Sequence, residues 1–236
     1  MKMSIAAVVL VCIALTSTAS ATILGTVNIQ NHNNALSDQG RLWGGGLSGL
    51  HAYTGIYSWT NAGGTDLGMA VPDWGFCIEL VQGPYNGWQN VINLEEAPLP
   101  GTPMQTTKAN YICELWGRNF DSSWLTGGTA NKQMAEAFGA AVWEIIYEDL
   151  PASPLSWDVN TGTGFHATSI EQAATANTWL HQLNGDTKYF ANNLAATSAP
   201  TGQDYLVLLP VSPTPEPATI AILGLGSLVL LRKRKA

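Results

Sequence analysis

The chain of 236 residues begins and ends with a short apolar segment, and each segment is too short to cross a bilayer. Residues 5–15 are an uninterrupted apolar run, and residues 218–231 are all apolar, small or hydroxylated. A membrane-spanning helix needs about 20 apolar residues, whereas a helix over residues 218–231 reaches only about 21 Å. A folded domain must therefore be built from the residues between these two segments.

The first segment has the layout of a secretory signal peptide. Lys2 supplies a positive start, the apolar run follows, and Ala19-Ser20-Ala21 places small residues where a signal peptidase cleaves. We expect residues 1–21 to be removed after Ala21. Cys12 lies inside the apolar run with no lipobox after it, so a lipoprotein signal is not indicated.

The last segment shows a different order of residue types. Residues 210–217 read P-V-S-P-T-P-E-P, a stretch that resists helix and sheet and behaves as a semi-rigid spacer. The apolar residues after it end in Arg232, Lys233, Arg234 and Lys235. Such a helix enters the membrane and stalls with its cations in the cytoplasm. Residues 218–236 are thus suited to a temporary hold, and an ordinary tail anchor is the alternative.

The order of these tail features resembles the PEP-CTERM sorting signal of Gram-negative bacteria, also described as an ice-binding protein C-terminal segment. The resemblance rests on Pro215, Glu216 and Pro217, on the apolar helix with its glycines, and on the basic end. It implies transient insertion in the inner membrane, recognition and cleavage by an exosortase-type protease, and delivery to the outer surface or an extracellular matrix.

Removal of residues 1–21 and 218–236 leaves an acidic chain. Five basic residues then stand against 17 acidic ones, a net charge of −12. Nucleic acids and anionic membrane surfaces are bound through Lys and Arg, so neither is an expected partner.

Residues 22–209 are expected to form one ectodomain of the α+β class. Strands at both ends with helices between them favour a β-barrel-like or sandwich-like framework with an inserted helical lobe, to which the tail adds a C-terminal apolar helix. Residues 31–49, rich in Asn and Gly, are read as a loop. The expected strands are 23–29, 53–59, 74–81 and 204–209, and the expected helices are 107–116, 131–147 and 168–182.

Three short blocks, 76–79, 108–112 and 138–145, together resemble the thioester domains of bacterial surface proteins. In that family, a cysteine on a strand forms an internal thioester with a glutamine that precedes an Ala-x-Trp pattern. The resemblance places Cys77 at the cysteine position and Gly139 at the glutamine position. Glycine has no side chain to acylate, so we expect that the thioester does not form.

Three roles stay open for Cys77. A free cysteine is among the most buried residue types, so the first is a packed thiol. The second is a disulfide with Cys113, the other cysteine of the mature chain, in an oxidising compartment. The third is a reactive nucleophile.

Other chemistry-bearing side chains give weaker signals. Trp59, Trp88 and Trp124 suit either sugar stacking or core packing. Glu144, Glu148 and Asp149 resemble a carboxylate pair for glycoside cleavage, but their place at a helix end favours a solvated face.

No cofactor-binding pattern emerges from the remaining residues. His51, His166 and His181 lack metal-ligand spacing. We find no phosphate-binding loop, nucleophile elbow or dinucleotide fingerprint.

The sequence thus predicts a non-enzymatic surface or matrix protein without cofactors, adhesive or structural in role. Its partners are the signal peptidase, the sorting protease, and a surface polysaccharide or neighbouring cell surface. The alternatives are an active thioester adhesin and a secreted carbohydrate-binding or carbohydrate-active protein.

Overall fold

The computed structural model describes residues 21–61 and 71–210, which contain seven strands and three α-helices. All strand pairs are antiparallel. The strands are β1 (Ile23–Gly44), β2 (Leu47–Asn61), β3 (Trp74–Cys77), β4 (Gly87–Asn93), β5 (Phe165–Thr168), β6 (Leu194–Ala199) and β7 (Gly202–Leu208). The helices are α1 (Gln105–Asn119), α2 (Thr129–Tyr147) and α3 (Ala173–His181).

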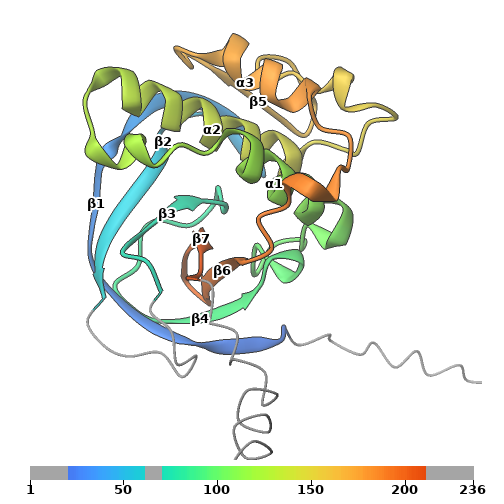
Figure 1. The fold of residues 1–236 in the computed structure, drawn as a ribbon. Coiled ribbons are helices and arrows are strands. Elements are labelled where there is room, and N and C mark those ends of the chain that lie inside the picture. The colour runs from blue at the N-terminus through green and yellow to red at the C-terminus, as the bar shows by residue number, and fades with distance from the viewer. Residues whose placement is uncertain (1–20, 62–70, 211–236) are drawn as a thin grey trace, which may run out of the picture.

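The sheet closes on itself through its longest strand. Its order is β2-β3-β7-β6-β4-β1-β5, and β1 also pairs with β2. The first part of β1 is bonded to β4, from Ile23 opposite Ile92 to Ile29 opposite Gly87, and the later part is bonded to β2. Irregularities in register within β1 accompany this change of partner. Six strands therefore form a ring, and β5 extends it at one side (Figure 1).

A two-residue turn joins the long strands β1 and β2. Gly44 pairs with Leu47, so Gly45 and Gly46 make the turn, with φ of 55° and 89°. A hairpin turn of this length requires positive φ at its central residues, which glycine adopts without strain. The glycine run that we read as loop is thus a tight hairpin. The loop predicted for residues 31–49 is wrong, because most of that segment is paired strand.

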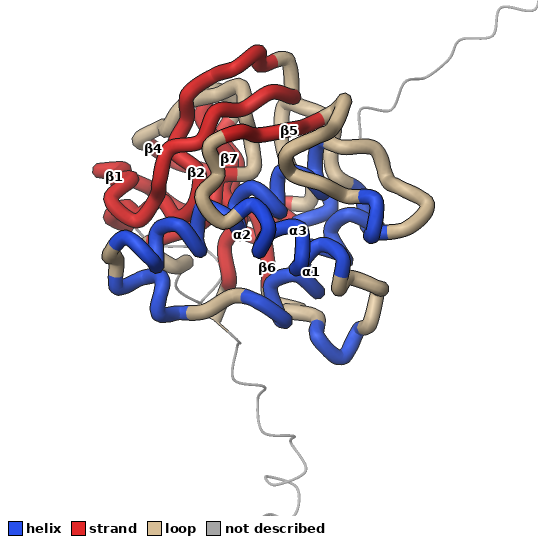
Figure 2. The backbone as a smooth tube through the Cα atoms, turned by 90° about the horizontal axis from the view of Figure 1, so that it is seen from above, coloured by secondary structure: helices blue, strands red, loops and turns tan. Residues whose placement is uncertain are grey.

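The helices gather on one side of the strands (Figure 2). They lie in the chain between β4 and β6, which are neighbours in the sheet. α2 packs mainly on β2 and β1, and every residue from Ala135 to Ile146 is buried. The apolar repeat of residues 131–147 correctly predicts this helix, and burial on all sides explains its small residues.

An aromatic cluster joins the helices to the ring. Phe138 of α2 lies 4.9 Å from Phe76 of β3, ring centroid to ring centroid, and contacts rings from three further elements. Those rings are Trp116, Phe120, Trp124 and Trp179. Such large apolar rings supply much of the hydrophobic driving force of a small domain.

The α+β prediction is confirmed, although several element boundaries differ from those predicted. The predicted helix 168–182 begins only at Ala173, since Ser169 has φ of 65°. The predicted strand 74–81 ends at Cys77. β4, β5 and β6 were not predicted. The signal peptide, the end of the spacer and the C-terminal apolar helix lie outside the described residues.

Candidate functional site

The thiol of Cys77 is buried. It donates a hydrogen bond to the Glu79 carbonyl oxygen at 2.9 Å, and the indole of Trp143 lies against it. Burial raises the pKa of this thiol well above its ordinary value. Because the thiolate is the nucleophilic form, Cys77 is held in its unreactive state.

Gly139 faces β2 at a distance that leaves little room for a side chain. A Cβ atom built on Gly139 would stand 3.0 Å from the Gly55 nitrogen and 3.2 Å from the Thr54 methyl carbon. Contact in the other direction is as tight, since a Cβ on Gly55 would lie 3.2 Å from the Ala135 carbonyl carbon. Ile56 pairs with Phe76, so Gly55 and Cys77 are the next positions on neighbouring strands. Cys77 and Gly139, the two positions singled out by the thioester resemblance, thus both lie beside Gly55 of β2.

Cys77 and Cys113 are free thiols in the structure, and a disulfide between them stays a prediction. Cys77 is buried, whereas Cys113 is half-buried on α1 near Glu95. Burial, with the Glu95 charge, raises the pKa of Cys113 to about 11. The packed-thiol interpretation of Cys77 is the one that this arrangement matches.

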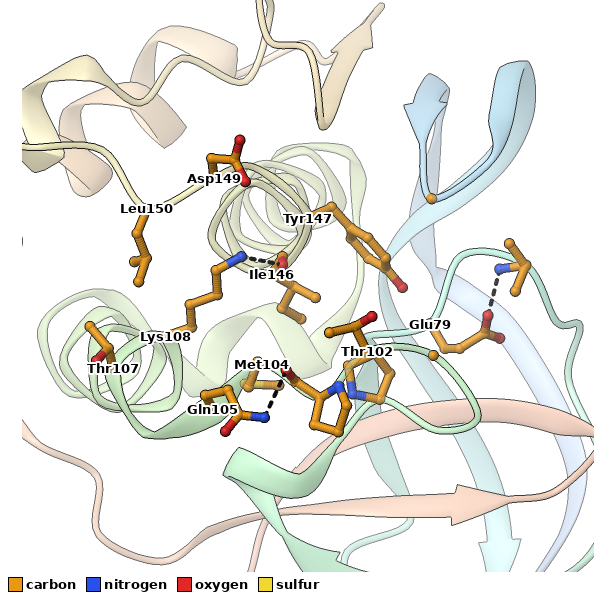
Figure 3. Close-up of a pocket in the computed structure, with 15 residues that line it drawn as sticks. Glu79, Thr102, Met104, Gln105, Thr107, Lys108, Ile146, Tyr147, Asp149 and Leu150 are labelled. Carbon is orange, nitrogen blue, oxygen red and sulfur yellow. Dashed lines mark hydrogen bonds between the residues drawn. The ribbon is translucent and has the colours of Figure 1, made fainter. Parts of the chain in front are cut away.

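A cavity of about 610 Å³ opens between the start of α1, the end of α2 and the loop before α1 (Figure 3). Its wall mixes apolar and polar groups. The chemistry-bearing side chains on it are Glu79, Gln105, Lys108, Tyr147 and Asp149.

Lys108 crosses from α1 to the end of α2. Its Nζ donates to the carbonyl oxygens of Ile146 and Glu148, each at 2.7 Å. A cation at this place satisfies carbonyls left free at the helix end and complements the helix dipole. Burial lowers the pKa of Lys108, and the nearby Asp149 and Glu148 carboxylates oppose that shift.

Glu79 and Tyr147 bind backbone at the opposite wall. The Glu79 carboxylate accepts from the Val81 and Gln82 nitrogens at 2.7 Å each. The Tyr147 hydroxyl donates to the Ile78 carbonyl at 3.2 Å and accepts from the Leu80 nitrogen at 3.1 Å. The side chains of Lys108, Glu79 and Tyr147 are therefore committed to holding the chain.

A second hollow, of about 350 Å³, lies next to the first and contains Glu144 and Glu148. Glu144 is only 1% exposed, so the expected solvated face is wrong for this residue. Burial raises the pKa of Glu144 to about 8, although its carboxyl accepts from the Asp158 nitrogen at 3.1 Å. The helix end is instead enclosed by the following loop.

The pKa of Glu148 shifts in the opposite direction to that of Glu144. Burial works to raise its pKa, but N–H groups of Phe165 and Gly164 outweigh burial and lower it. Those two bonds are 3.1 and 2.9 Å long. Two carboxyl groups with contrasting pKa values are typical of a catalytic acid–base pair. Here, however, Glu144 and Glu148 each accept hydrogen bonds from the backbone of a loop. Asp149 is exposed.

The tryptophans divide into packed and exposed residues. Trp59 and Trp124 are buried, whereas Trp88 of β4 is 57% exposed. His166 and His181 bind the backbone carbonyls of Gly162 and Trp157. Within the described ranges, no group of three or more metal-ligating side chains comes together.

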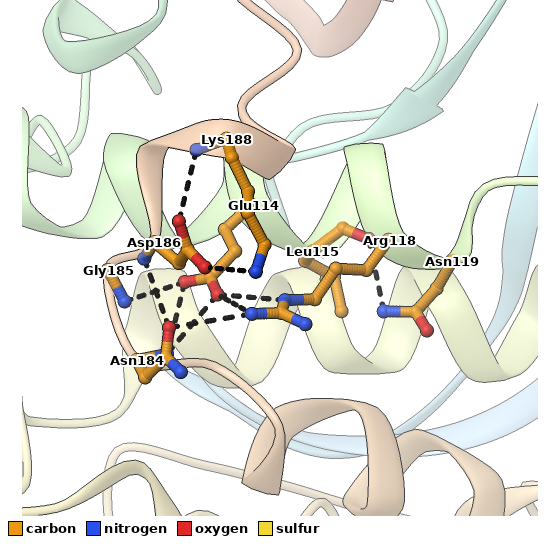
Figure 4. Close-up of polar contacts among 8 residues, drawn as sticks. All are labelled: Glu114, Leu115, Arg118, Asn119, Asn184, Gly185, Asp186 and Lys188. Atoms are coloured by element: carbon orange, nitrogen blue, oxygen red, sulfur yellow. Dashed lines mark hydrogen bonds and ion pairs between the residues drawn. The ribbon is translucent and has the colours of Figure 1, made fainter.

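The sequence analysis missed a buried carboxylate that joins α1 to a distant loop (Figure 4). Glu114 is fully buried and forms an ion pair with Arg118, with 2.7 Å between Oε1 and Nη2. Its oxygens also accept from the Asn184 and Gly185 nitrogens, at 2.7 Å for Gly185. The four-residue spacing of Glu114 and Arg118 was the available signal.

The sorting residues Pro215, Glu216 and Pro217 and the basic cluster Arg232, Lys233, Arg234 and Lys235 lie outside the described residues. Within residues 21–61 and 71–210, no helix has the length and apolar character needed to cross a membrane.

Comparison with known proteins identifies one segment. No curated protein and no solved structure matches the chain. Residues 213–235 match the PEP-CTERM protein-sorting motif, as expected from the tail. The chain therefore carries a PEP-CTERM motif, which supports an exported protein that is sorted by an exosortase to the cell surface or the extracellular space.

Proposed function

We propose that this protein is a non-enzymatic scaffold of the cell surface or extracellular matrix, adhesive or structural in role. The sorting motif at residues 213–235 carries the proposal. Residues 1–21 are the signal peptide, 22–209 the ectodomain, 210–217 the spacer and 218–236 the tail that is held transiently in the inner membrane.

The ectodomain is proposed to be a thioester-domain-like fold that has lost its covalent chemistry. Two observations support the loss of the thioester chemistry. Cys77 is a buried thiol with a raised pKa, and Gly139 packs on the Gly55 backbone where a glutamine would need space. The polar groups of the cavity support the scaffold role, because Lys108 and Glu79 hold backbone groups.

The test is the intact mass of the protein released by its native host. Cleavage at both ends, with the full mass of the ectodomain, is the expected result. A variant with Pro215, Glu216 and Pro217 replaced by alanine is the control and should keep its tail. Release of wild-type protein with its tail intact would refute the sorting proposal. A mass lower by one ammonia would show that a thioester forms.

A second candidate function, binding of a surface polysaccharide, is favoured by two exposed rings. Trp88 is 57% and Tyr85 37% exposed, and only Asn86 and Gly87 separate them in the chain. Exposed aromatic faces can stack on sugar rings. Retention of the ectodomain on matrix polysaccharide, lost in Trp88→Ala but kept in the buried-site control Trp124→Phe, would support this function. Equal retention of wild type and Trp88→Ala would exclude this surface.

A further inference from the structure

Thr22 follows the small-residue pattern Ala19-Ser20-Ala21, at which the signal peptide is expected to be cleaved. Cleavage there makes the Thr22 nitrogen the first atom of the mature chain. In the precursor this nitrogen is a neutral amide with one proton. In the mature protein it is an α-amino group, which is protonated at neutral pH for the most part.

Both polar groups of Thr22 bind the same carboxylate. The Thr22 nitrogen lies 2.8 Å from Glu96 Oε2, and the Thr22 hydroxyl donates to Glu96 Oε1 at 3.0 Å. Glu96 is 74 residues further along the chain, at the end of a short 3₁₀ helix (Leu94–Glu96) that directly follows β4. The carboxylate is therefore already placed on the atom that cleavage would charge.

No cationic side chain neutralises Glu96 in the part of the chain that the structure describes. The ion pairs there are Arg118 with Glu114 and Lys188 with Asp186. The adjacent residue, Glu95, is exposed and adds a second negative charge to the same helical turn. A positive charge at Thr22 would thus enter a locally acidic environment.

We propose that removal of the signal peptide after Ala21 creates an ion pair between the α-ammonium group of Thr22 and the carboxylate of Glu96, which fastens the ring in the mature protein. This inference rests on the proposed export of the chain. Charge-assisted hydrogen bonds are about twice as strong as neutral ones. The same nitrogen and oxygen atoms therefore interact more strongly after processing, without any rearrangement of the fold.

The pair is exposed to solvent and lies at the end of a β-ladder. Ile23 is opposite Ile92 at the first rung of the β1–β4 ladder, and Thr22 and Glu96 lie just beyond that rung. Ile23 is largely exposed, so packing alone holds this end of β1 weakly. The ion pair would close the open end of the seam where β1 completes the ring.

The experiment compares three forms of the mature chain, residues 22–209 with the spacer attached. The first begins at Thr22, the second is Glu96→Gln in that chain, and the third begins at Ala21 and retains an amide at Thr22. The acylation rate of the α-amine is measured against pH by peptide mass spectrometry. In the chain that begins at Thr22, the midpoint should lie about half a unit above that of Glu96→Gln.

Thermal unfolding provides the second readout. The chain that begins at Thr22 should unfold at a higher temperature than the one that begins at Ala21. This difference should shrink in 1 M salt, where the screening length falls to about 3 Å, and vanish when both carry Glu96→Gln. Equal α-amine midpoints in wild type and Glu96→Gln would overturn the ion pair.

Mass spectrometry of the exported protein separates this inference from the proposed function. A first residue other than Thr22 overturns the inference, even if the tail is cleaved as proposed. A retained tail refutes the sorting proposal, and the recombinant chains still decide whether the ion pair forms.

Discussion

Gly139 of α2 and Gly55 of β2 touch backbone to backbone, so a Cβ atom on Gly139 would come within 3.0 Å of the Gly55 nitrogen. Gly139→Ala should therefore push α2 away from β2 and cost about 1–3 kcal/mol in the free energy of unfolding. Urea denaturation measures this change. Gly83→Ala is the control, because a Cβ there meets no atom within 4 Å. Equal stability of the two variants would show that the helix can move off the strand freely.

The two thiols of the mature chain should differ in reactivity. Cys77 is buried and Cys113 half-buried, and burial raises the pKa of both. An alkylating reagent at pH 8 should label Cys113 slowly and spare Cys77 until urea unfolds the protein. Peptide mass spectrometry reads each site, with Cys113→Ser as the matched control. Rapid labelling of Cys77 in the native protein would contradict a packed thiol.

The Glu114 carboxylate should be among the most sensitive polar positions. Glu114→Ala removes the acceptor for the Gly185 nitrogen and leaves the Arg118 guanidinium without its ion-pair partner. A loss on the order of 3 kcal/mol is expected. Hydrogen exchange at Gly185 should accelerate with it. Substitution of the exposed Glu95 by alanine serves as control and should leave that exchange unchanged.

Stability should decline as the pH rises toward 8. Burial raises the pKa of Glu144 to about 8 and that of Glu136 and Asp204 to about 7. In the unfolded chain these carboxyl groups have pKa values of about 4. Between the unfolded and folded pKa values, the folded state therefore binds more protons than the unfolded chain. The resulting stabilisation is complete below about pH 4, and it is lost as the pH rises through the pKa values of the folded state.

Glu144→Gln tests this pH dependence, because the amide cannot ionise. The variant should lose less stability than wild type between pH 5 and 8, by more than about 1 kcal/mol. Glu148 has the opposite effect on stability. Burial works to raise its pKa, but hydrogen bonds from backbone N–H groups outweigh burial and lower it, so its protonation in stronger acid destabilises the fold. Parallel stability curves for wild type and Glu144→Gln would show that Glu144 is ionised in the folded protein.

The sequence predicted the parts of this protein that depend on local pattern. The apolar repeat of 131–147 defines α2, and the order of proline, apolar and basic residues defines the sorting tail. The loop prediction for residues 31–49 failed, because Asn and Gly are typical of loops but also occur here at an exposed strand edge and in the turn at Gly45, which requires glycine.

The role of the acidic residues could not be predicted in the same way. Glu79, Glu114 and Glu144 each bind N–H groups of a loop, and two of these loops are far along the chain. A carboxylate that will be buried looks the same in sequence as one on the surface. Only the fold decides which amide it meets, as for Thr22 and Glu96.

The place of β7 in the ring sets the timing of folding during export. β7 lies between β3 and β6, so the ring cannot close before residues 202–208 are available. A chain that leaves the cytoplasm from its N-terminus presents this strand last, immediately before the spacer. Until then the ectodomain lacks the β3–β7 and β7–β6 pairings that join its two halves. The last strand of the ectodomain to emerge is therefore the one that completes the ring.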